Sequence, residues 1–281
     1  MPTAEQLRIQ SYEMWETIAP SWERRQAFVE ENAGPVRRWM LDELAPRPGD
    51  TILELAAGAG QTGFEATRLL GADGRLITTD FAPAMLEAAR RRGRELGIEN
   101  VEYRVIDAER MELGADSVDG VLCRYGYMLM PDPAAALSET RRVLRAGGRL
   151  VMAVFGPPDR NPFFAIIAMA LVQRGHMPPP APDGPGLFSM ASEERTTRLL
   201  EGAGFTAVRT EMVPAPRFPF RDVEEYMSLI GDTAGPIAVA LRRVPGDERE
   251  QIMAQLEAAF APFATDGGYE LPGLTLAAVA S

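Results

Sequence analysis

Apolar and polar positions follow two different periods in the central part of the chain, from residue 51 to about residue 155. Short apolar runs bounded by glycine, proline or aspartate predict buried strands, and apolar residues at three- and four-residue spacing between them predict amphipathic helices. The predicted strands cover residues 51–55, 75–79, 101–106, 117–123 and 149–155. The predicted helices cover about residues 61–70, 83–96 and 133–145. Strands that alternate with helices predict an α/β fold with a parallel sheet, right-handed crossovers and helices on both faces.

Helical spacing also marks both flanks of this region. The leader reads as helical over residues 5–18, 21–31 and 34–44, and it contains all three tryptophans. The tryptophans either pack the leader against the sheet or, in the alternative interpretation, Tyr12, Trp15 or Trp22 lines a pocket as part of a lid. After residue 156 the pattern predicts a helix at 161–173, a strand at 206–212, helices over 222–264 and a final strand within 267–280. We therefore expect an N-terminal helical cap over residues 1–48 and a main domain over residues 49–281, with cap or lid insertions at about 157–190 and 214–264.

A glycine-rich turn joins the first predicted strand to the first predicted helix. Gly58, Gly60 and Gly63 stand at the spacing of a dinucleotide-binding turn. Glycines suit a turn with positive φ and let a ligand approach bare backbone, and the N–H groups that begin the next helix face that ligand. Asp80 follows at a distance suited to a ribose. The turn alone fits either a nicotinamide dinucleotide or S-adenosylmethionine.

Acidic residues end two successive predicted strands. Asp80 ends the second strand and Asp107 follows the third, while Cys123, Arg124 and Tyr125 come at the end of the fourth. Ligands of open α/β sheets bind at the carboxyl ends of the strands, so these side chains are candidates for ligand contact. Asp80 would accept hydrogen bonds from ribose hydroxyls and Asp107 from an exocyclic amine. In the alternative interpretation, each acid caps a helix or a turn.

Composition removes several classes of function. The chain of 281 residues has a net charge of −11 and a sequence pI of about 4.8, which argues against a nucleic-acid partner. It contains no lysine, so a Schiff-base lysine and a P-loop lysine are excluded. One cysteine and one histidine leave no cysteine-rich or two-histidine metal site, so we expect no metal. The absence of a long apolar run and of signal-peptide features predicts a protein without a membrane span in the cytoplasm.

The ordered set of motifs resembles the class I S-adenosylmethionine-dependent methyltransferases, in particular their ubiquinone/menaquinone-biosynthesis-like small-molecule branch. The resemblance covers about residues 50–155 and rests on the segments 52–60, 80–86, 107–109, 117–121, 131–133 and 142–150. It implies a Rossmann-like, seven-stranded, mostly parallel sheet with an antiparallel last strand. The segment Gly268–Pro272 resembles that closing strand. This chain departs from the family in having Ala56 and Ala82 where glycine and serine are frequent.

The resemblance implies S-adenosylmethionine as the cofactor and assigns its contacts. Glu54, the Ala56–Gly60 turn and Gln61 would hold the methionine end, Asp80 the ribose, and Met85, Asp107 and Ala108 the adenine. The complete set of expected cofactor-binding residues is Glu54, Ala56, Gly58, Gly60, Gln61, Asp80, Phe81, Met85, Asp107, Ala108 and Cys123. Cys123 is alternatively a packed residue. An acid in the first strand suits a ligand with an ammonium group better than a pyrophosphate, which favours the methyl donor over NAD.

Methyl transfer from a sulfonium requires alignment and a dry site, and it requires a base only when the acceptor must lose a proton. The candidates for catalysis or acceptor contact are His176, Arg124 and Tyr125. Because the fourth strand is not followed by an Asn-Pro-Pro-Tyr-like motif, we predict transfer to an oxygen or carbon atom of a small, partly apolar molecule. The alternatives are an NAD(P)-dependent oxidoreductase and a non-catalytic protein that binds S-adenosylmethionine. The chain is expected to act as a monomer or a homodimer.

Overall fold

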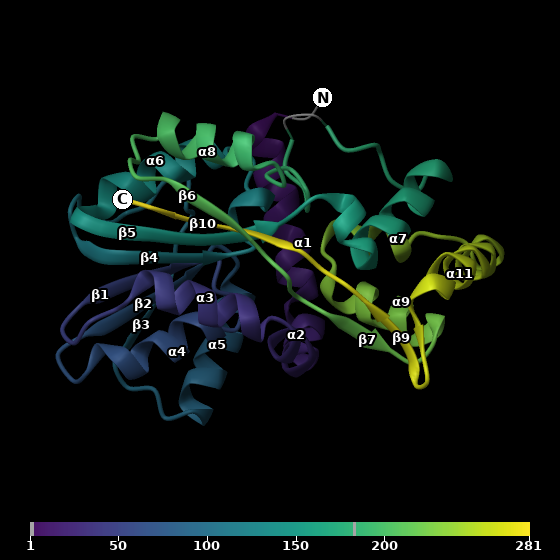
Figure 1. Cartoon of the computed structure of the whole chain (residues 1–281), viewed down its shortest axis with the longest axis horizontal. Helices are drawn as coiled ribbons and strands as arrows, with labels where there is room; N and C mark the ends of the chain where they lie inside the picture. Colours follow the sequence, from purple (N-terminus) through teal and green to yellow (C-terminus); the bar gives the residue numbers. More distant parts are fainter. Residues whose placement is uncertain (1–2, 182–183) are drawn as a thin grey trace.

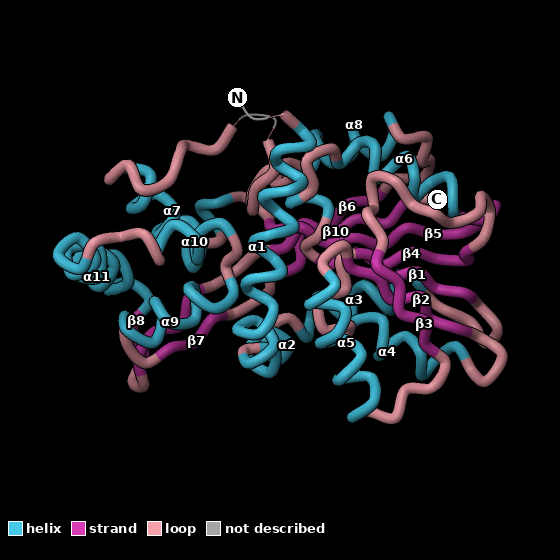
Figure 2. The backbone as a smooth tube through the Cα atoms, turned by 180° about the vertical axis from the view of Figure 1, so that it is seen from behind, coloured by secondary structure: helices cyan, strands magenta, loops and turns pink. Residues whose placement is uncertain are grey.

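A computed structural model of the chain describes residues 3–181 and 184–281. It contains a large twisted sheet flanked by helices and, beside it, a helical region with a small second sheet (Figures 1 and 2). The N-terminal helix α1 (Ala4–Arg24) runs between these two parts. Residues 182–183 of the predicted insertion at 157–190 lie outside the described residues.

The large sheet has seven strands in the order β3-β2-β1-β4-β5-β10-β6. Its strands are β1 (Thr51–Leu55), β2 (Arg75–Asp80), β3 (Val101–Val105), β4 (Val118–Arg124), β5 (Leu144–Phe155), β6 (Arg209–Val213) and β10 (Thr275–Ala280). Strands β1 to β5 pair with one another in parallel, and β10 is antiparallel to both β5 and β6. This topology confirms the predicted mostly parallel sheet with an antiparallel last strand.

Helices cover both faces of the large sheet (Figure 1). One face packs on α3 (Gly34–Leu44), α4 (Gln61–Leu70) and α5 (Pro83–Glu95). The other face packs on α6 (Pro133–Val143) and α8 (Glu193–Gly202). All five residues of β1 are buried, as expected for a central strand with helices on both sides.

Local sequence explains where the helices begin. The side chain of Thr3 accepts the N–H of Gln6, and the side chain of Gln6 accepts the N–H of Thr3, which forms a capping box at the start of α1. Asp132 caps α6 by accepting the N–H of Ala135 at 2.9 Å. Proline stands in the first turn of α5 and α6, where its missing N–H removes no intrahelical hydrogen bond.

The region beside the large sheet combines helices from both ends of the chain. It contains α7 (Pro162–Gln173), α9 (Val223–Thr233), α10 (Pro236–Leu241) and α11 (Gly246–Phe260). The short helix α2 (Gln26–Asn32) connects α1 to α3. A small antiparallel sheet of β7 (Phe218–Phe220), β9 (Gly268–Leu271) and β8 (Ala264–Thr265) completes this region. This second sheet is absent from the sequence-based expectation.

The predicted final strand is divided into two strands in different sheets. Gly268–Leu271 pairs with Phe218–Phe220 in the small sheet, whereas Thr275–Ala280 inserts into the large sheet. The expectation that the segment Gly268–Pro272 forms the closing strand was therefore wrong. Pro272 cannot donate a ladder hydrogen bond, and Gly273 packs directly against Pro216, so the chain leaves one sheet before it enters the other.

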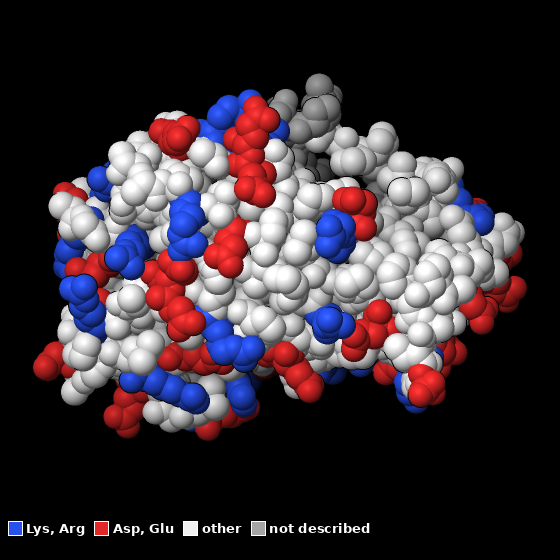
Figure 3. All heavy atoms as spheres, viewed as in Figure 1, with Lys and Arg blue, Asp and Glu red and all other residues white. Residues whose placement is uncertain are grey.

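The face of the molecule shown in Figure 3 carries arginine side chains interspersed with acidic ones over the large sheet. Within residues 3–181 and 184–281, no helix is long and apolar enough to cross a membrane. The same residues contain no group of three or more histidine, cysteine, aspartate or glutamate side chains that could hold a metal ion.

Candidate active site

A deep cavity lies at the carboxyl ends of the central strands, between the large sheet and the helical region. Its wall divides into a polar half and an aromatic half. The polar half is formed by strand ends, the glycine turn and α1, and contains Arg8, Glu54, Asp80, Asp107, Glu109 and Arg124. The aromatic half contains Phe28, Tyr125, Phe155, Phe163, Phe164 and Phe218. One end of the cavity is thus suited to a polar ligand and the other to an apolar one.

The glycine turn has the left-handed backbone that its sequence predicts. Gly58 has a φ of 55° and Gly60 a φ of 80°. Ala56 is also left-handed, with a φ of 49°, which costs an L-residue about 1–2 kcal/mol. This cost explains why glycine is the easier residue at the position of Ala56. The N–H of Ala57 is bonded to Thr79, 2.9 Å away at the end of β2, so the turn is tied to the neighbouring strand.

Glu54 supports the turn from beneath. Its carboxylate accepts the N–H of Gly63 at 2.7 Å and the hydroxyl of Thr78 at 2.8 Å. Burial raises the pKa of Glu54 to about 7, in opposition to these two hydrogen bonds. Both carboxylate oxygens therefore already have protein partners. Because Gly63 lies in the first turn of α4, one amide that a pyrophosphate would use is also occupied.

Asp80 joins the turn to the second strand. Its two carboxylate oxygens accept the N–H of Gly58 and the N–H of Ala82, each at 3.0 Å. Burial raises the pKa of Asp80 to about 6. Phe81 and Met85 line the cavity beside it. Each carboxylate oxygen keeps a further lone pair, so Asp80 can still accept hydrogen bonds from a diol.

Asp107 lies in the same half of the cavity and is paired with a residue from the leader. One carboxylate oxygen accepts the N–H of Glu109 at 2.9 Å, and the other lies 3.1 Å from Nε of Arg8. Arg8 also forms an ion pair with Glu109, whose other oxygen accepts the N–H of Asp132 at 2.9 Å. Helix α1 is thereby fixed to the acid that was predicted to read an adenine amine.

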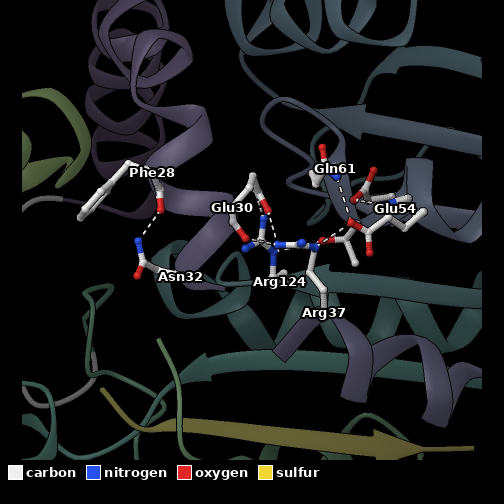
Figure 4. Close-up of polar contacts among 10 residues, drawn as sticks. Phe28, Glu30, Asn32, Arg37, Glu54, Gln61 and Arg124 are labelled. Carbon is white, nitrogen blue, oxygen red and sulfur yellow. Dashed lines mark hydrogen bonds and ion pairs between the residues drawn. The ribbon is translucent and has the colours of Figure 1, made fainter. Parts of the chain in front are cut away.

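Arg124 is the buried cation of the polar half (Figure 4). Its Nε donates to Thr62 at 3.0 Å, and its Nη2 is ion-paired with Glu30 of α2. Burial lowers the pKa of this guanidinium, but Glu30 and the neighbouring Tyr125 raise it by more, so the net shift is upward and Arg124 stays charged. Within the described residues, Nη1 of Arg124 is buried without a hydrogen-bond partner.

Tyr125 stands where the two halves meet. Its φ of 60° is uncommon for an aromatic residue and turns the chain away from the end of β4. The ring stacks on Phe155 with 4.4 Å between centroids, and the hydroxyl is 2.8 Å from Oγ1 of Thr275. Burial raises the pKa of Tyr125 to about 12. The phenol therefore keeps its proton at neutral pH.

The aromatic half is assembled from distant parts of the chain. Phe163 of α7 stacks on Phe218 of β7 with 4.0 Å between ring centroids. Phe164 packs on Phe155 with 4.8 Å between centroids, and Phe28 of α2 lies 6.4 Å from Phe218. Such a surface fits a flat or apolar molecule next to the polar half.

Comparison with known proteins shows the family to which this chain belongs. Residues 46–172 match the family described as Methyltransferase domain. Aklanonic acid methyltransferase DauC of Streptomyces sp. (strain C5) is 30% identical over 188 residues, which cover 62% of this chain and 83% of that protein. This chain is a class I S-adenosylmethionine-dependent methyltransferase.

Other similar proteins agree with this assignment. The ubiquinone/menaquinone biosynthesis C-methyltransferase UbiE of Klebsiella pneumoniae (strain 342) is 34% identical over 127 residues, or 45% of this chain and 51% of UbiE. The match therefore spans about half the length of UbiE. The crystal structure of YcgJ from Bacillus subtilis has a TM-score of 0.60 and 19% identity, covering 87% of this chain and 96% of YcgJ, and shows the same fold.

The polar half of the cavity fits the cofactor of this methyltransferase. Asp80 and Asp107 offer carboxylate oxygens to hydroxyl and amine donors, and the buried Nη1 of Arg124 lacks an acceptor within the described residues. S-adenosylmethionine carries ribose hydroxyls, an adenine amine and a carboxylate, and it has no pyrophosphate. The first-turn amide of Gly63 is already bonded to Glu54, which agrees with a ligand that brings no phosphate.

Most of the residues predicted for the site lie on the cavity wall of the methyltransferase. They are Glu54, Ala56, Gly58, Asp80, Phe81, Met85, Asp107, Ala108, Arg124 and Tyr125. Gly60, Gln61, Cys123 and His176 are not on this wall. Gln61 donates to Glu65 at 2.9 Å, Cys123 is fully buried, and Nε2 of His176 is 2.6 Å from a carboxylate oxygen of Glu248. His176 therefore faces Glu248 and does not line the cavity.

Sequence reasoning missed the residues that reach the cavity from outside the central motifs. Arg8 comes from the leader, and Phe163 and Phe218 come from segments without a motif. Glu30, also from the leader, acts through Arg124 and does not line the cavity itself. Trp15 and Trp22 also line the cavity, whereas Tyr12 is exposed and packs its ring against Phe81. A charged residue on a leader helix is ordinary in sequence, and only the tertiary contact distinguishes it.

Proposed function

We propose that this methyltransferase transfers the methyl group to an oxygen or carbon atom of a small, partly apolar acceptor that binds in the aromatic half of the cavity. The observation that carries this proposal is the continuity of the two halves at Tyr125 and Phe155. The names of the similar proteins, which act on aklanonic acid or in ubiquinone and menaquinone biosynthesis, also favour a small cyclic acceptor.

We propose the following roles in cofactor binding. Asp80 accepts the ribose hydroxyls, Asp107 and the backbone of Ala108 bind the adenine, and Phe81 and Met85 pack beside it. Glu54 holds the Gly63 amide and so fixes the turn rather than contacting the ligand through a free oxygen. Gln61, which donates to Glu65, and the buried Cys123 lie outside the cavity wall, so we propose no direct contact of either with the cofactor. When bound, S-adenosylmethionine supplies an electrophilic methyl group on a sulfonium.

The aromatic half aligns the acceptor and excludes water. Desolvation strengthens the attraction between a nucleophile and a cationic sulfonium and is a main contribution that a protein makes to this displacement. Tyr125 is the titratable side chain among the described residues of this half, and its raised pKa makes it a poor base. We therefore propose that the acceptor loses its proton, where it has one to lose, without a side-chain base.

The surrounding elements are proposed to form a cap over the acceptor. Helices α1 to α3, together with residues 157–190 and 214–264, place Phe28, Phe163 and Phe218 around the aromatic half. We also propose that the protein is a monomer or a homodimer, which size-exclusion chromatography tests. We propose a cytoplasmic location, which cell fractionation tests.

Calorimetric titration with S-adenosylmethionine, S-adenosylhomocysteine and NADH tests the cofactor. We expect micromolar binding of the first two and none of NADH. A screen with radiolabelled methyl donor and a panel of phenols, quinols and aromatic carboxylic acids then tests the acceptor class. Transfer only to amines or to a protein would contradict the proposal. Binding of the donor without transfer to any member of the panel would contradict the proposed acceptor class and leave the cofactor assignment intact.

A further inference from the structure

Arg124 lines the cavity, and one nitrogen of its guanidinium is buried without a hydrogen-bond partner among the described residues. Its side chain is only 10% exposed, and its Nε and Nη2 are committed to Thr62 and Glu30. Nη1 has no hydrogen-bond partner within residues 3–181 and 184–281. A buried charged donor without an acceptor costs free energy, so an oxygen from a ligand is the natural partner for this group.

The surroundings of Arg124 favour an anion. Thr62 lies in the first turn of α4, and the positive end of this helix therefore faces the same part of the cavity. The turn residues Ala56, Ala57 and Gly58 line the cavity next to it. The first-turn amide of Gly63 is already bonded to Glu54, so the guanidinium of Arg124, with its unpartnered Nη1, is the main source of positive potential in this part of the cavity.

Glu30 fixes the orientation of Arg124. It is buried on α2 and pairs with Arg124 on one side and with Arg37, at 2.9 Å, on the other (Figure 4). Arg37 in turn lies 3.0 Å from Glu65, which accepts from Gln61. Positive and negative side chains therefore alternate in this network. An anion bound to Nη1 of Arg124 would add one more negative group, on the cavity side of Arg124.

The position of the turn identifies the anion. The N–H of Gly58 is bonded to Asp80, the proposed ribose-binding acid, and the turn separates Asp80 from the first turn of α4 and from Arg124. A cofactor with its ribose at Asp80 therefore directs its amino-acid end toward Arg124. We propose that Nη1 of Arg124 binds the carboxylate of the methionine moiety and that Glu30 is a positioning residue for Arg124. This inference rests on the proposed placement of the cofactor.

Glu30 also connects the proposed cofactor contact of Arg124 to the N-terminal helices. Because it belongs to α2, the carboxylate of the cofactor and the N-terminal helices share one guanidinium. The cofactor is thereby linked to α2 through Arg124, in addition to the contact of α1 with Asp107 through Arg8. Hydrogen exchange of the α2 amides should therefore slow more with S-adenosylmethionine than with a ligand that lacks the carboxylate.

Calorimetry with two ligands on the full chain tests the role of Arg124. S-adenosylmethionine is compared with decarboxylated S-adenosylmethionine, which lacks only the carboxylate. The wild-type protein should prefer the complete cofactor by about 10- to 100-fold, as expected for a charge-assisted hydrogen bond. Arg124→Gln should reduce this preference to less than about threefold. If this variant does not fold, Arg124→Lys serves instead and should reduce the preference at least about fivefold, because an ammonium lacks the forked geometry.

A second pair of variants tests the positioning role of Glu30. Glu30→Ala removes the acceptor that orients the guanidinium and should lower the preference for the complete cofactor by at least about fivefold. Glu30→Gln keeps an oxygen acceptor and should keep the wild-type preference. Glu23→Gln is the matched control, because Glu23 pairs with Arg91 between α1 and α5 away from the cavity wall. It should leave the preference unchanged.

Two results would overturn the inference. Equal binding of both ligands by the folded wild-type protein would show that Arg124 does not bind the cofactor carboxylate and would leave an acidic acceptor as its partner. An unchanged preference in folded Arg124→Gln would give the carboxylate another site. In either case S-adenosylmethionine still binds, so the proposed function stands, whereas failure of the wild-type protein to bind either ligand would contradict the proposed function itself.

Discussion

The two halves of the cavity are built in different ways. The polar half comes from consecutive strand ends between β1 and β4, and backbone amides fix its acids, as in the bonds of Gly58 and Ala82 to Asp80. The aromatic half comes from α2, β5, α7 and β7, and ring packing holds it together. The first arrangement is local and fixes individual polar atoms. The second depends on the whole fold and fixes a shape, which leaves room for different acceptors on one cofactor-binding frame.

The largest effect is expected from removing a ring of the aromatic half. Phe218 is 6% exposed and stacks on Phe163, so Phe218→Ala leaves a cavity and should lower the free energy of unfolding by about 3–5 kcal/mol. Binding of S-adenosylhomocysteine to the folded protein should change less than about threefold. Urea unfolding and calorimetry measure the two quantities. Met169→Ala, at a 59% exposed position on α7, is the control and should change stability by less than about 0.5 kcal/mol. A large loss of cofactor affinity in Phe218→Ala would mean that the two halves are not separate.

The corresponding change in the polar half is Asp80→Ala, which should affect cofactor binding rather than stability. It removes the carboxylate that is proposed to accept two hydrogen bonds from the ribose hydroxyls, and it should weaken binding of S-adenosylhomocysteine at least about 100-fold. Circular dichroism should show the same fold. Asp119→Asn is the control, since Asp119 accepts the N–H of Thr51 at the opposite ends of the strands and should leave affinity unchanged. Unchanged affinity in folded Asp80→Ala would count against the proposed site.

The buried acid beneath the turn should make stability depend on pH. The pKa of Glu54 is raised from 4.5 to about 7 in the folded protein, so between these values the unfolded chain ionises first. The contribution of Glu54 to the free energy of unfolding is therefore highest below pH 4.5 and falls by roughly 3 kcal/mol as the pH rises from 4.5 to about 7. Glu54→Gln should flatten this part of the stability profile, measured by urea unfolding from pH 5 to pH 8. An identical slope in the variant and the wild type would contradict the assigned pKa.

The smallest effect is expected at His176. Because its ring is paired with Glu248 away from the cavity wall, His176→Ala should change methyl transfer less than about twofold and stability by less than about 1 kcal/mol. Initial rates with an acceptor from the screen and thermal unfolding measure both. A loss of activity above tenfold would restore the histidine as a candidate base.

The sequence predicts the polar half far better than the aromatic half, and the reason is physical. Strand periodicity, the glycine turn and the acids at strand ends are local, so the succession of strands β1 to β5 along the chain and the placement of Asp80 and Asp107 at strand ends follow from neighbouring residues. Arg8 and Glu30 act through contacts with residues far along the chain, which no spacing encodes. The division of the last segment at Pro272 and Gly273 likewise depends on Pro216, which lies beside Gly273 only in the folded protein.

The central claim is that one cavity holds the cofactor in its polar half and the acceptor in its aromatic half. A crystal structure of the protein with S-adenosylhomocysteine tests it most directly. The ribose should lie on Asp80, the adenine beside Asp107 and Ala108, and the sulfur should face Tyr125 and the aromatic half. A nucleoside bound among Phe163 and Phe218, or outside the cavity, would contradict this account.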